Sequence, residues 1–185
     1  MKPGVLFQTE YGHIRFSKQF RLMLKSCMSI ESGRYAFDNI SVTETGFVVT
    51  NGYKLFCCCV NHHLQPGLLH LTTEGFGLAN NDAGNFPKWQ DVTLKDDEVK
   101  EIYKANALIA TIPENFIYHL NRTGINFRVG WTLDVLNRLE KLNATDLVLY
   151  VHNKNATEKQ FMIRGRIQDS NFLYVQMPIQ PPREQ

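Results

Sequence analysis

The sequence predicts an α+β fold made of two β-α-β-β-β halves, with two helices side by side on one face of a continuous antiparallel sheet. Two observations predict it. An amphipathic helical pattern occurs twice, in residues 18–28 and 132–142. Each pattern follows a short strand-like run and precedes several strand-like runs separated by turn residues. The halves share this order without residue identity, so the repeat is architectural, and both helices should present their polar faces on the same side.

The first half is predicted within residues 1–60. Strand-like runs at 5–9 and 12–16 precede Ser17, which is placed for a helix N-cap. The apolar residues of the following helix recur at spacings of three, four and seven: Phe20, Met23, Leu24, Cys27 and Met28. A helix with one apolar stripe is expected to pack that stripe on a sheet.

Two strands should complete this half, at about 35–43 and 46–60. Ser32-Gly33 ends the helix before them. Glu44-Thr-Gly46 predicts the hairpin turn between the strands, and Asn51-Gly52 predicts a turn inside the second run.

Residues 61–124 are predicted to be an irregular connection, because turn-forming Gly, Asn and Pro recur there. The stretch 101–112 is compatible with a helix or a strand, and Pro113 is expected to end it. The carboxylates of Asp96-Asp97-Glu98 stand in the charged run 95–100, which is more typical of a solvated face than of a catalytic cluster.

The second half is predicted within residues 125–180, followed by a short tail at 181–185. Residues 126–129 are strand-like, and Thr132 stands at a helix N-cap position. The apolar stripe of this helix consists of Val135, Leu136, Leu139 and Leu142. Asn143-Ala-Thr-Asp146 ends the helix, and strands are expected at 147–152, 160–167 and 171–179.

Composition excludes several classes of protein. The chain has 185 residues, 43% of them hydrophobic, so it can bury an ordinary core. Its 20 basic and 18 acidic residues are too balanced to indicate nucleic-acid binding from bulk charge. No apolar run reaches the roughly 18 residues that span a bilayer, and the first residues lack a signal-peptide core. A cytoplasmic protein without membrane partners is therefore expected.

The cluster Cys57-Cys58-Cys59 with His62-His63 contains residue types that bind zinc. Neighbouring cysteines in a strand point to opposite faces, and the spacing lacks two separated ligand pairs, so buried cysteines acting as small hydrophobes are favoured over a metal site. The sequence contains no recognisable catalytic motif. We therefore predict a binding protein without cofactor or metal, and not an enzyme.

Several segments share their order and spacing with one family. The C-terminal part contains, in order, Phe127-Arg-Val-Gly-Trp-Thr-Leu-Asp-Val-Leu-Asn137, Leu142, Asp146-Leu-Val-Leu-Tyr150 and Tyr174-Val-Gln-Met-Pro-Ile179. It resembles the last half-domain of the bacterial-type DNA polymerase processivity clamp, or beta sliding clamp, where a Leu-Asp-Val-Leu-Asn helix precedes three strands and a Met-Pro-Met type ending.

Further segments extend the resemblance to about two-thirds of the chain. Val49-Thr-Asn-Gly-Tyr-Lys-Leu55 is similar to the Thr-Asp-Gly-His-Arg-Leu strand of clamps, and Arg34-Tyr-Ala-Phe-Asp-Asn-Ile40 is similar to the strand after the first helix. Asn85-Phe-Pro-Lys-Trp-Gln-Asp-Val92 is similar to the Phe-Pro-x-Tyr-x-x-Val segment. The resemblance implies a DNA-clamp-type domain. Clamp protomers carry three such domains, and this chain has room for one.

The resemblance also implies two sites. Clamp helices line a central hole and meet the backbone of duplex DNA, and the corresponding positive charges here are Lys18, Arg21, Lys25, Arg138 and Lys141. The alternative is a solvated helix face. Clamps also bind short peptides in a groove, whose counterparts here are Thr50, Gly52, Tyr53, Leu55, Val175, Met177 and Pro178. The alternative is that these are ordinary sheet residues.

The predicted function is that of a sliding-clamp-like replication accessory or processivity factor. It would bind duplex DNA non-specifically and bind DNA polymerase or other replication proteins through peptide motifs. A closed ring of six such domains requires six copies, so a homo-oligomer is expected. The alternative is a non-ring interaction protein of clamp fold, of phage or mobile-element type, that binds host replication proteins without encircling DNA.

Overall fold

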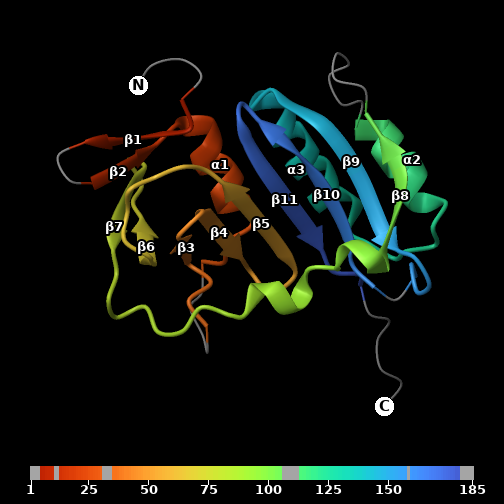
Figure 1. Cartoon of the computed structure of the whole chain (residues 1–185), viewed down its shortest axis with the longest axis horizontal. Coiled ribbons are helices and arrows are strands. Elements are labelled where there is room, and N and C mark those ends of the chain that lie inside the picture. The colour runs from red at the N-terminus through yellow and green to blue at the C-terminus, as the bar shows by residue number, and fades with distance from the viewer. Residues whose placement is uncertain (1–4, 11–12, 31–34, 106–112, 158, 180–185) are drawn as a thin grey trace.

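The computed structural model describes residues 5–10, 13–30, 35–105, 113–157 and 159–179, and it is an α+β fold around one 11-stranded sheet (Figure 1). The strands are β1 Phe7–Glu10, β2 His13–Phe16, β3 Asn39–Thr43, β4 Gly46–Thr50, β5 Lys54–Cys59, β6 Gly67–Leu71, β7 Phe76–Ala79, β8 Val99–Lys104, β9 Ala144–His152, β10 Phe161–Ile167 and β11 Ser170–Gln176. The helices are α1 Lys18–Ser26, α2 Pro113–Asn121 and α3 Val129–Lys141, with 3-10 turns η1 Trp89–Val92 and η2 Asp96–Glu98.

The sheet is continuous and antiparallel, as predicted. Its strand order is β1-β2-β7-β6-β3-β4-β5-β11-β10-β9-β8. The two halves of the chain meet where β5 pairs with β11, in a register that places Leu55 opposite Val175. Strands β1 and β8 form the two edges, far apart in the view of Figure 1.

In the second half, one helix and the three strands after it follow the predicted order, and the first half is larger than predicted. In the first half the hairpin β6–β7 lies between β2 and β3, within the range 61–124 expected to be irregular. The turn residues there separate short strands: Thr72 and Gly75 close the β6–β7 turn through backbone hydrogen bonds. Composition alone does not distinguish such a turn from a long loop.

The stretch 101–112 was compatible with a helix or a strand. Its first residues, 101–104, belong to strand β8, and residues 106–112 lie outside the described residues. Pro113 begins α2 rather than ending an element, so the prediction for this residue was wrong. Proline is well suited to the first helical turn, because its missing N–H would have no partner there. The apolar residues Phe116 and Leu120 of α2 are buried against the same core as the other helices.

Helix starts were predicted correctly once and incorrectly once. Ser17 caps α1, its side chain accepting a hydrogen bond from the backbone N–H of Phe20. Thr132 does not cap α3, which begins at Val129 after Arg128, so no strand occupies 126–129. The Thr132 hydroxyl is buried and donates to Gln176 Oε1 at 3.1 Å. Thr132 therefore makes a contact with a residue 44 positions away in the chain, and not the local capping contact that the sequence predicted.

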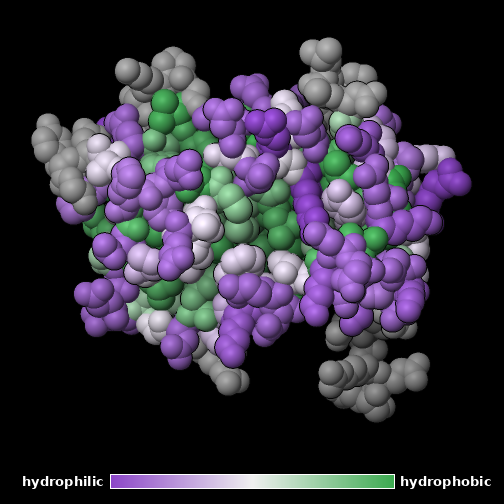
Figure 2. Space-filling model, viewed as in Figure 1, coloured by the Kyte–Doolittle hydropathy of each residue, from purple (hydrophilic) through white to green (hydrophobic). Residues whose placement is uncertain are grey.

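The sheet separates two apolar cores. Phe47, Phe56 and Tyr174 face the main core, which contains the buried faces of all three described helices. Val48, Leu55 and other alternate residues face a smaller core on the opposite side, which the segment around Trp89 and Leu94 covers. This alternation is the period-two pattern of strands. Figure 2 shows hydrophobic residues gathered near the middle of the face toward the viewer, framed by hydrophilic ones.

In the described part of the chain, no helix is long and apolar enough to cross a membrane. Two predicted features lie outside the described residues: the helix break at 32–33 and the tail at 181–185.

Gly46 generates a stability prediction. A Cβ at this position would lie 2.0 Å from the carbonyl oxygen of Cys58 on the paired strand. Gly46→Ala should therefore force β4 and β5 apart and lower the free energy of unfolding by about 3 kcal/mol in urea titrations. Gly67→Ala is the matched control, because nothing lies within 4 Å of its added Cβ. Equal losses in the two variants would contradict this account.

Candidate functional site

The face of the sheet opposite the helices contains a small apolar cavity of about 190 Å³ at the junction of the halves. Its walls are Tyr35, Phe37, Thr50, Gly52, Tyr53, Lys54, Leu55, Pro87, Lys88, Trp89, Val92, Val175 and Met177. The β5–β11 pairing brings the walls together, and the backbone N–H of Met177 donates to the carbonyl of Tyr53 at 2.9 Å. Segments more than a hundred residues apart thus share one cavity.

Six of the seven predicted peptide-site residues line this cavity, and Pro178 does not. The structure also adds walls that were not predicted as site residues. Trp89 and Pro87 come from the Phe-Pro-Lys-Trp segment, and Tyr35 and Phe37 come from the stretch before β3. These aromatic residues were noted only as part of the family resemblance. Their clustering with the other walls is tertiary, and spacing along the chain does not indicate it.

A rigid turn places Tyr53 at the cavity. The Thr50 hydroxyl donates to the Lys54 carbonyl at 2.7 Å, and the Asn51 side chain accepts from the backbone N–H groups of Tyr53 and Lys54. Gly52 has φ +84°, which an L side chain rarely adopts. The turn leaves Tyr53 62% exposed beside the cavity, so its ring is free to contact a ligand.

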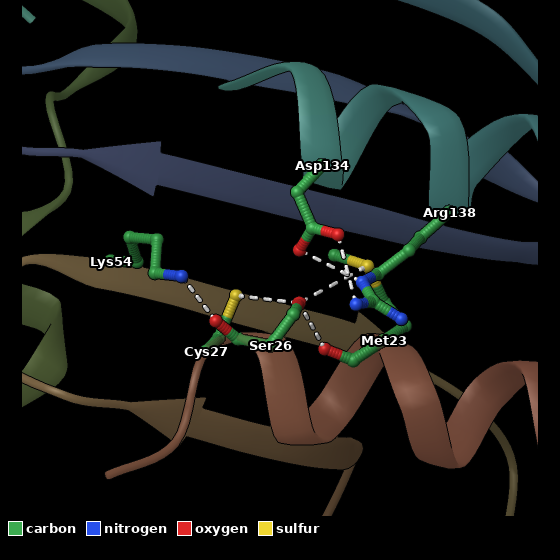
Figure 3. Close-up of polar contacts among 6 residues, drawn as sticks. All are labelled: Met23, Ser26, Cys27, Lys54, Asp134 and Arg138. Atoms are coloured by element: carbon green, nitrogen blue, oxygen red, sulfur yellow. Dashed lines mark hydrogen bonds and ion pairs between the residues drawn. The ribbon is translucent and has the colours of Figure 1, made fainter. Parts of the chain in front are cut away.

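Lys54 is a buried cation next to the cavity. Its ammonium donates to the backbone carbonyl of Ser26 at the end of α1 (Figure 3). The same ammonium lies 5.1 Å from the Trp131 ring centroid. The carboxyl end of a helix and an aromatic face both stabilise a positive charge. Lys54 therefore joins β5 to α1 and α3. Burial raises the pKa of the nearby Cys27 thiol to about 11, although the positive charge of Lys54 works in the opposite direction.

The predicted DNA-facing charges do not all gather in one place. Lys18, Arg21 and Lys141 line one polar cleft of about 420 Å³, where the start of α1 meets the end of α3. Arg15 from β2 lines the same cleft and was missed by sequence reasoning, because it lies outside the helical periodicity. The cleft also contains the carboxylate of Glu74.

The other two predicted charges are placed differently. Lys25 is exposed near the end of α1 and does not line this cleft. Arg138 forms an ion pair with Asp134 on α3, with Nη2 to Oδ1 at 2.9 Å (Figure 3). An ion-paired guanidinium offers less net positive charge to a phosphate. The three residues that share the cleft are therefore the stronger candidates.

Among the described residues, no group of three or more His, Cys, Asp or Glu side chains could hold a metal ion. Cys58 faces the main core, and Cys57 faces the smaller one, as predicted from strand alternation. The His62 ring stacks on the Phe47 ring, with the two ring centroids 5.3 Å apart. Asp96 lies on the surface in an ion pair with Arg164 at 2.6 Å, which agrees with a solvated charged run.

The end of β11 is held to α3 by one amide side chain. Gln176 is fully buried, and its Oε1 accepts hydrogen bonds from the hydroxyls of Tyr174 at 2.6 Å and Thr132 at 3.1 Å. Its Nε2 donates to the carbonyl of Arg128 at 3.3 Å. Burial raises the pKa of Tyr174 well above its ordinary value, so the phenol stays a neutral donor. This network fixes the strand that continues into Met177.

Solved structures of bacterial sliding clamps share this fold. The DnaN sliding clamp (DNA polymerase III subunit beta) of Pseudomonas aeruginosa bound to griselimycin aligns with 98% of this chain and 67% of its own, at TM-score 0.54 and 15% identity. A second structure, of the DNA polymerase sliding clamp from Pseudomonas aeruginosa, aligns with 95% of this chain and 76% of its own, at TM-score 0.56 and 13% identity.

The beta subunit from DNA polymerase of Streptococcus pyogenes aligns with 87% of this chain at TM-score 0.53 and 9% identity, and the match spans 63% of that subunit. No protein-family model and no curated protein sequence matches the chain. The predicted resemblance is therefore confirmed at the level of structure, and the fold is that of bacterial sliding clamps.

The buried network generates a second prediction. Gln176→Leu removes the acceptor of the Tyr174 hydroxyl, and a buried donor without a partner should lower the free energy of unfolding by about 2 kcal/mol. Adding Tyr174→Phe removes that donor, so the double variant should recover about 1 kcal/mol relative to Gln176→Leu. Urea titrations of both single variants and the double variant measure this coupling. Strictly additive losses would rule the network out.

Proposed function

We propose that this protein is a sliding-clamp-like replication accessory, which binds duplex DNA through its helix face and replication proteins through the apolar cavity. The observation that carries the proposal is the cavity at the β5–β11 junction. On a fold shared with sliding clamps, it unites the two segments for which the family resemblance implies peptide binding. The function is binding, and the described residues need no catalytic group to perform it.

The cavity suits an apolar anchor of a short peptide. Its walls combine aliphatic side chains with aromatic rings, and Met177 adds a flexible thioether that adapts to different anchors. Small pockets of this kind take one or two side chains of an extended segment. Lys88 is exposed at the rim and supplies a positive charge, so a peptide with an acidic residue beside its apolar anchor is favoured.

The cleft at the helix ends suits a phosphate backbone. Four cationic side chains and one carboxylate line this cleft. The cations are those of Arg15, Lys18, Arg21 and Lys141, and the carboxylate is that of Glu74. Contacts of this kind are electrostatic and independent of base sequence. The N-terminal turn of α1 adds the positive end of a helix dipole to the same place. We therefore expect this cleft to bind duplex DNA without sequence specificity and in a salt-sensitive way.

Self-assembly belongs to the same proposal. Among the described residues, the outer sides of β1 and β8 pair with no further strand. Pairing of one edge with the other edge of a second copy would continue the sheet from copy to copy, and a constant rotation would close a ring. A closed ring would hold the helix faces of all copies toward a common centre.

Peptide binding is tested by fluorescence anisotropy with a labelled peptide that carries the clamp-binding motif of a bacterial replicative polymerase. Met177→Glu places a carboxylate on the apolar wall, which should weaken binding at least about tenfold. Ile179→Glu is the matched control, because Ile179 is exposed two residues later and does not line the cavity. If both variants bind as the wild type does, the cavity is not the peptide site.

DNA binding is tested by titrating labelled duplex DNA at several salt concentrations. The triple variant Lys18→Glu, Arg21→Glu and Lys141→Glu should remove about three phosphate contacts, which makes the negative slope of log K against log salt shallower by about 2.7. The control reverses the three exposed lysines Lys95, Lys154 and Lys159, with the same change in net charge.

Three outcomes of that titration are distinguishable. Loss of affinity in the helix variant alone supports the proposed DNA face. Equal loss in both triple variants shows that net charge, and not the cleft, governs binding. Absence of salt-sensitive binding by the wild type, with peptide binding intact, overturns the DNA part of the proposal and leaves an interaction protein of clamp fold.

A further inference from the structure

One segment between β7 and β8 forms a wall of the apolar cavity without belonging to the sheet (Figure 1). We call its residues 85–98 the strap. Leu94 of the strap is buried in the smaller core, on the face of the sheet opposite the helices. Pro87, Trp89 and Val92 of the strap line the cavity. The shape of the cavity therefore depends on where the strap lies.

The part of the strap at the cavity is the single 3-10 turn η1. The backbone N–H of Thr93 and its hydroxyl both donate to the carbonyl of Gln90, at 3.3 and 2.9 Å, and so close the end of the turn. Side chains at positions i and i+3 of a 3-10 turn lie on the same side. Trp89 and Val92 are three residues apart, and both line the cavity. A contact that holds Val92 therefore also places Trp89.

The side chain of Gln160 holds this turn to the sheet. Gln160 stands two residues before Met162, which faces the smaller core, so strand alternation points Gln160 to the same face. Gln160 is buried, and its Nε2 donates to the backbone carbonyl of Val92 at 2.6 Å. Gln160 does not itself line the cavity. It is therefore placed to fix a wall of the cavity without contacting a ligand there.

The other polar anchors of the strap are farther from the cavity along the chain or more exposed. The backbone carbonyls of Asn85 and Glu98 accept backbone hydrogen bonds at the two ends of the strap. Arg164 pairs with Asp96 at 2.6 Å, but the Asp96 side chain is 85% exposed. Exposed ion pairs contribute little, because water and salt screen them. The buried Gln160 contact is therefore the stronger restraint on η1.

We propose that Gln160 is a positioning residue for peptide binding, which keeps Trp89 and Val92 in the cavity wall before a ligand arrives. The inference rests on the proposed function of the cavity and identifies what keeps the cavity formed. A wall that is fixed in advance need not be ordered on binding, so less of the interaction energy is lost. Without the Gln160 donor, the formed cavity is populated for a smaller fraction of the time, and the apparent Kd rises in proportion.

The first test measures the affinity of the labelled polymerase-motif peptide by fluorescence anisotropy. Gln160→Met keeps the length of the side chain and removes the donor. It should raise the Kd about fivefold, which corresponds to the loss of one net hydrogen bond of about 1 kcal/mol. Gln160→Lys restores a donor on a stem that reaches Val92, and should return the Kd to within about twofold of the wild type.

Gln65→Met is the matched control, because it makes the same chemical change at an exposed residue that does not line the cavity. It should bind the peptide as the wild type does. All variants are compared under conditions in which urea titrations show them to be folded, so a general loss of stability does not enter the Kd.

The second test follows the strap without any peptide. Trp89 and Trp131 are the two tryptophans of the chain, so in a Trp131→Phe background the tryptophan emission comes from Trp89. Adding Gln160→Met should shift this emission to longer wavelength and increase its quenching by acrylamide, because Trp89 meets water more often. Gln160→Lys should reverse both changes, and Gln65→Met should cause neither.

The two tests together separate positioning from other roles. An unchanged Kd in Gln160→Met, an equal loss in Gln65→Met, or weaker binding with unchanged Trp89 emission and quenching would each overturn the proposal. A wild type that binds no peptide overturns the function proposed for the cavity. The Trp89 measurements then still confirm or overturn the placement of the cavity wall by Gln160.

Discussion

The antiparallel pairing of β5 with β11 is the interaction on which the rest of the structure depends. It joins the two halves into one sheet, with Leu55 opposite Val175 and Lys54 opposite Gln176. Helices α1 and α3 can then pack side by side, since they cover adjacent parts of the same face. The apolar cavity on the other face exists only because this pairing places Tyr53 next to Met177.

Polar contacts secure the same junction from the helix side. Lys54 reaches from β5 to the end of α1 and to Trp131, and Gln176 reaches from β11 to the start of α3. Both side chains are buried and both are satisfied, which is the condition under which polar groups in a core specify one arrangement. These contacts resist sliding of the two halves, because a shift of one residue would reverse every side chain on each strand.

The two faces of the sheet support different chemistry for a simple physical reason. The helix face ends in a polar cleft whose cations come from α1, α3 and β2, so it suits a polyanion. The opposite face has apolar walls and one small cavity, so it suits a hydrophobic side chain. One sheet thereby separates two surfaces of different chemistry.

Local patterns in the sequence determined the elements: apolar spacing located α1 and α3, Ser17 marked a helix start, and Glu44-Thr-Gly46 marked a hairpin. Such features depend on neighbours a few residues away, so the chain alone reveals them. Tertiary structure decided the β6–β7 insertion, the start of α3 and the place of Arg15 and Trp89 at the sites. Each of these depends on partners distant in the chain, such as Gln176 for Thr132, and no local periodicity encodes which distant strands will pair.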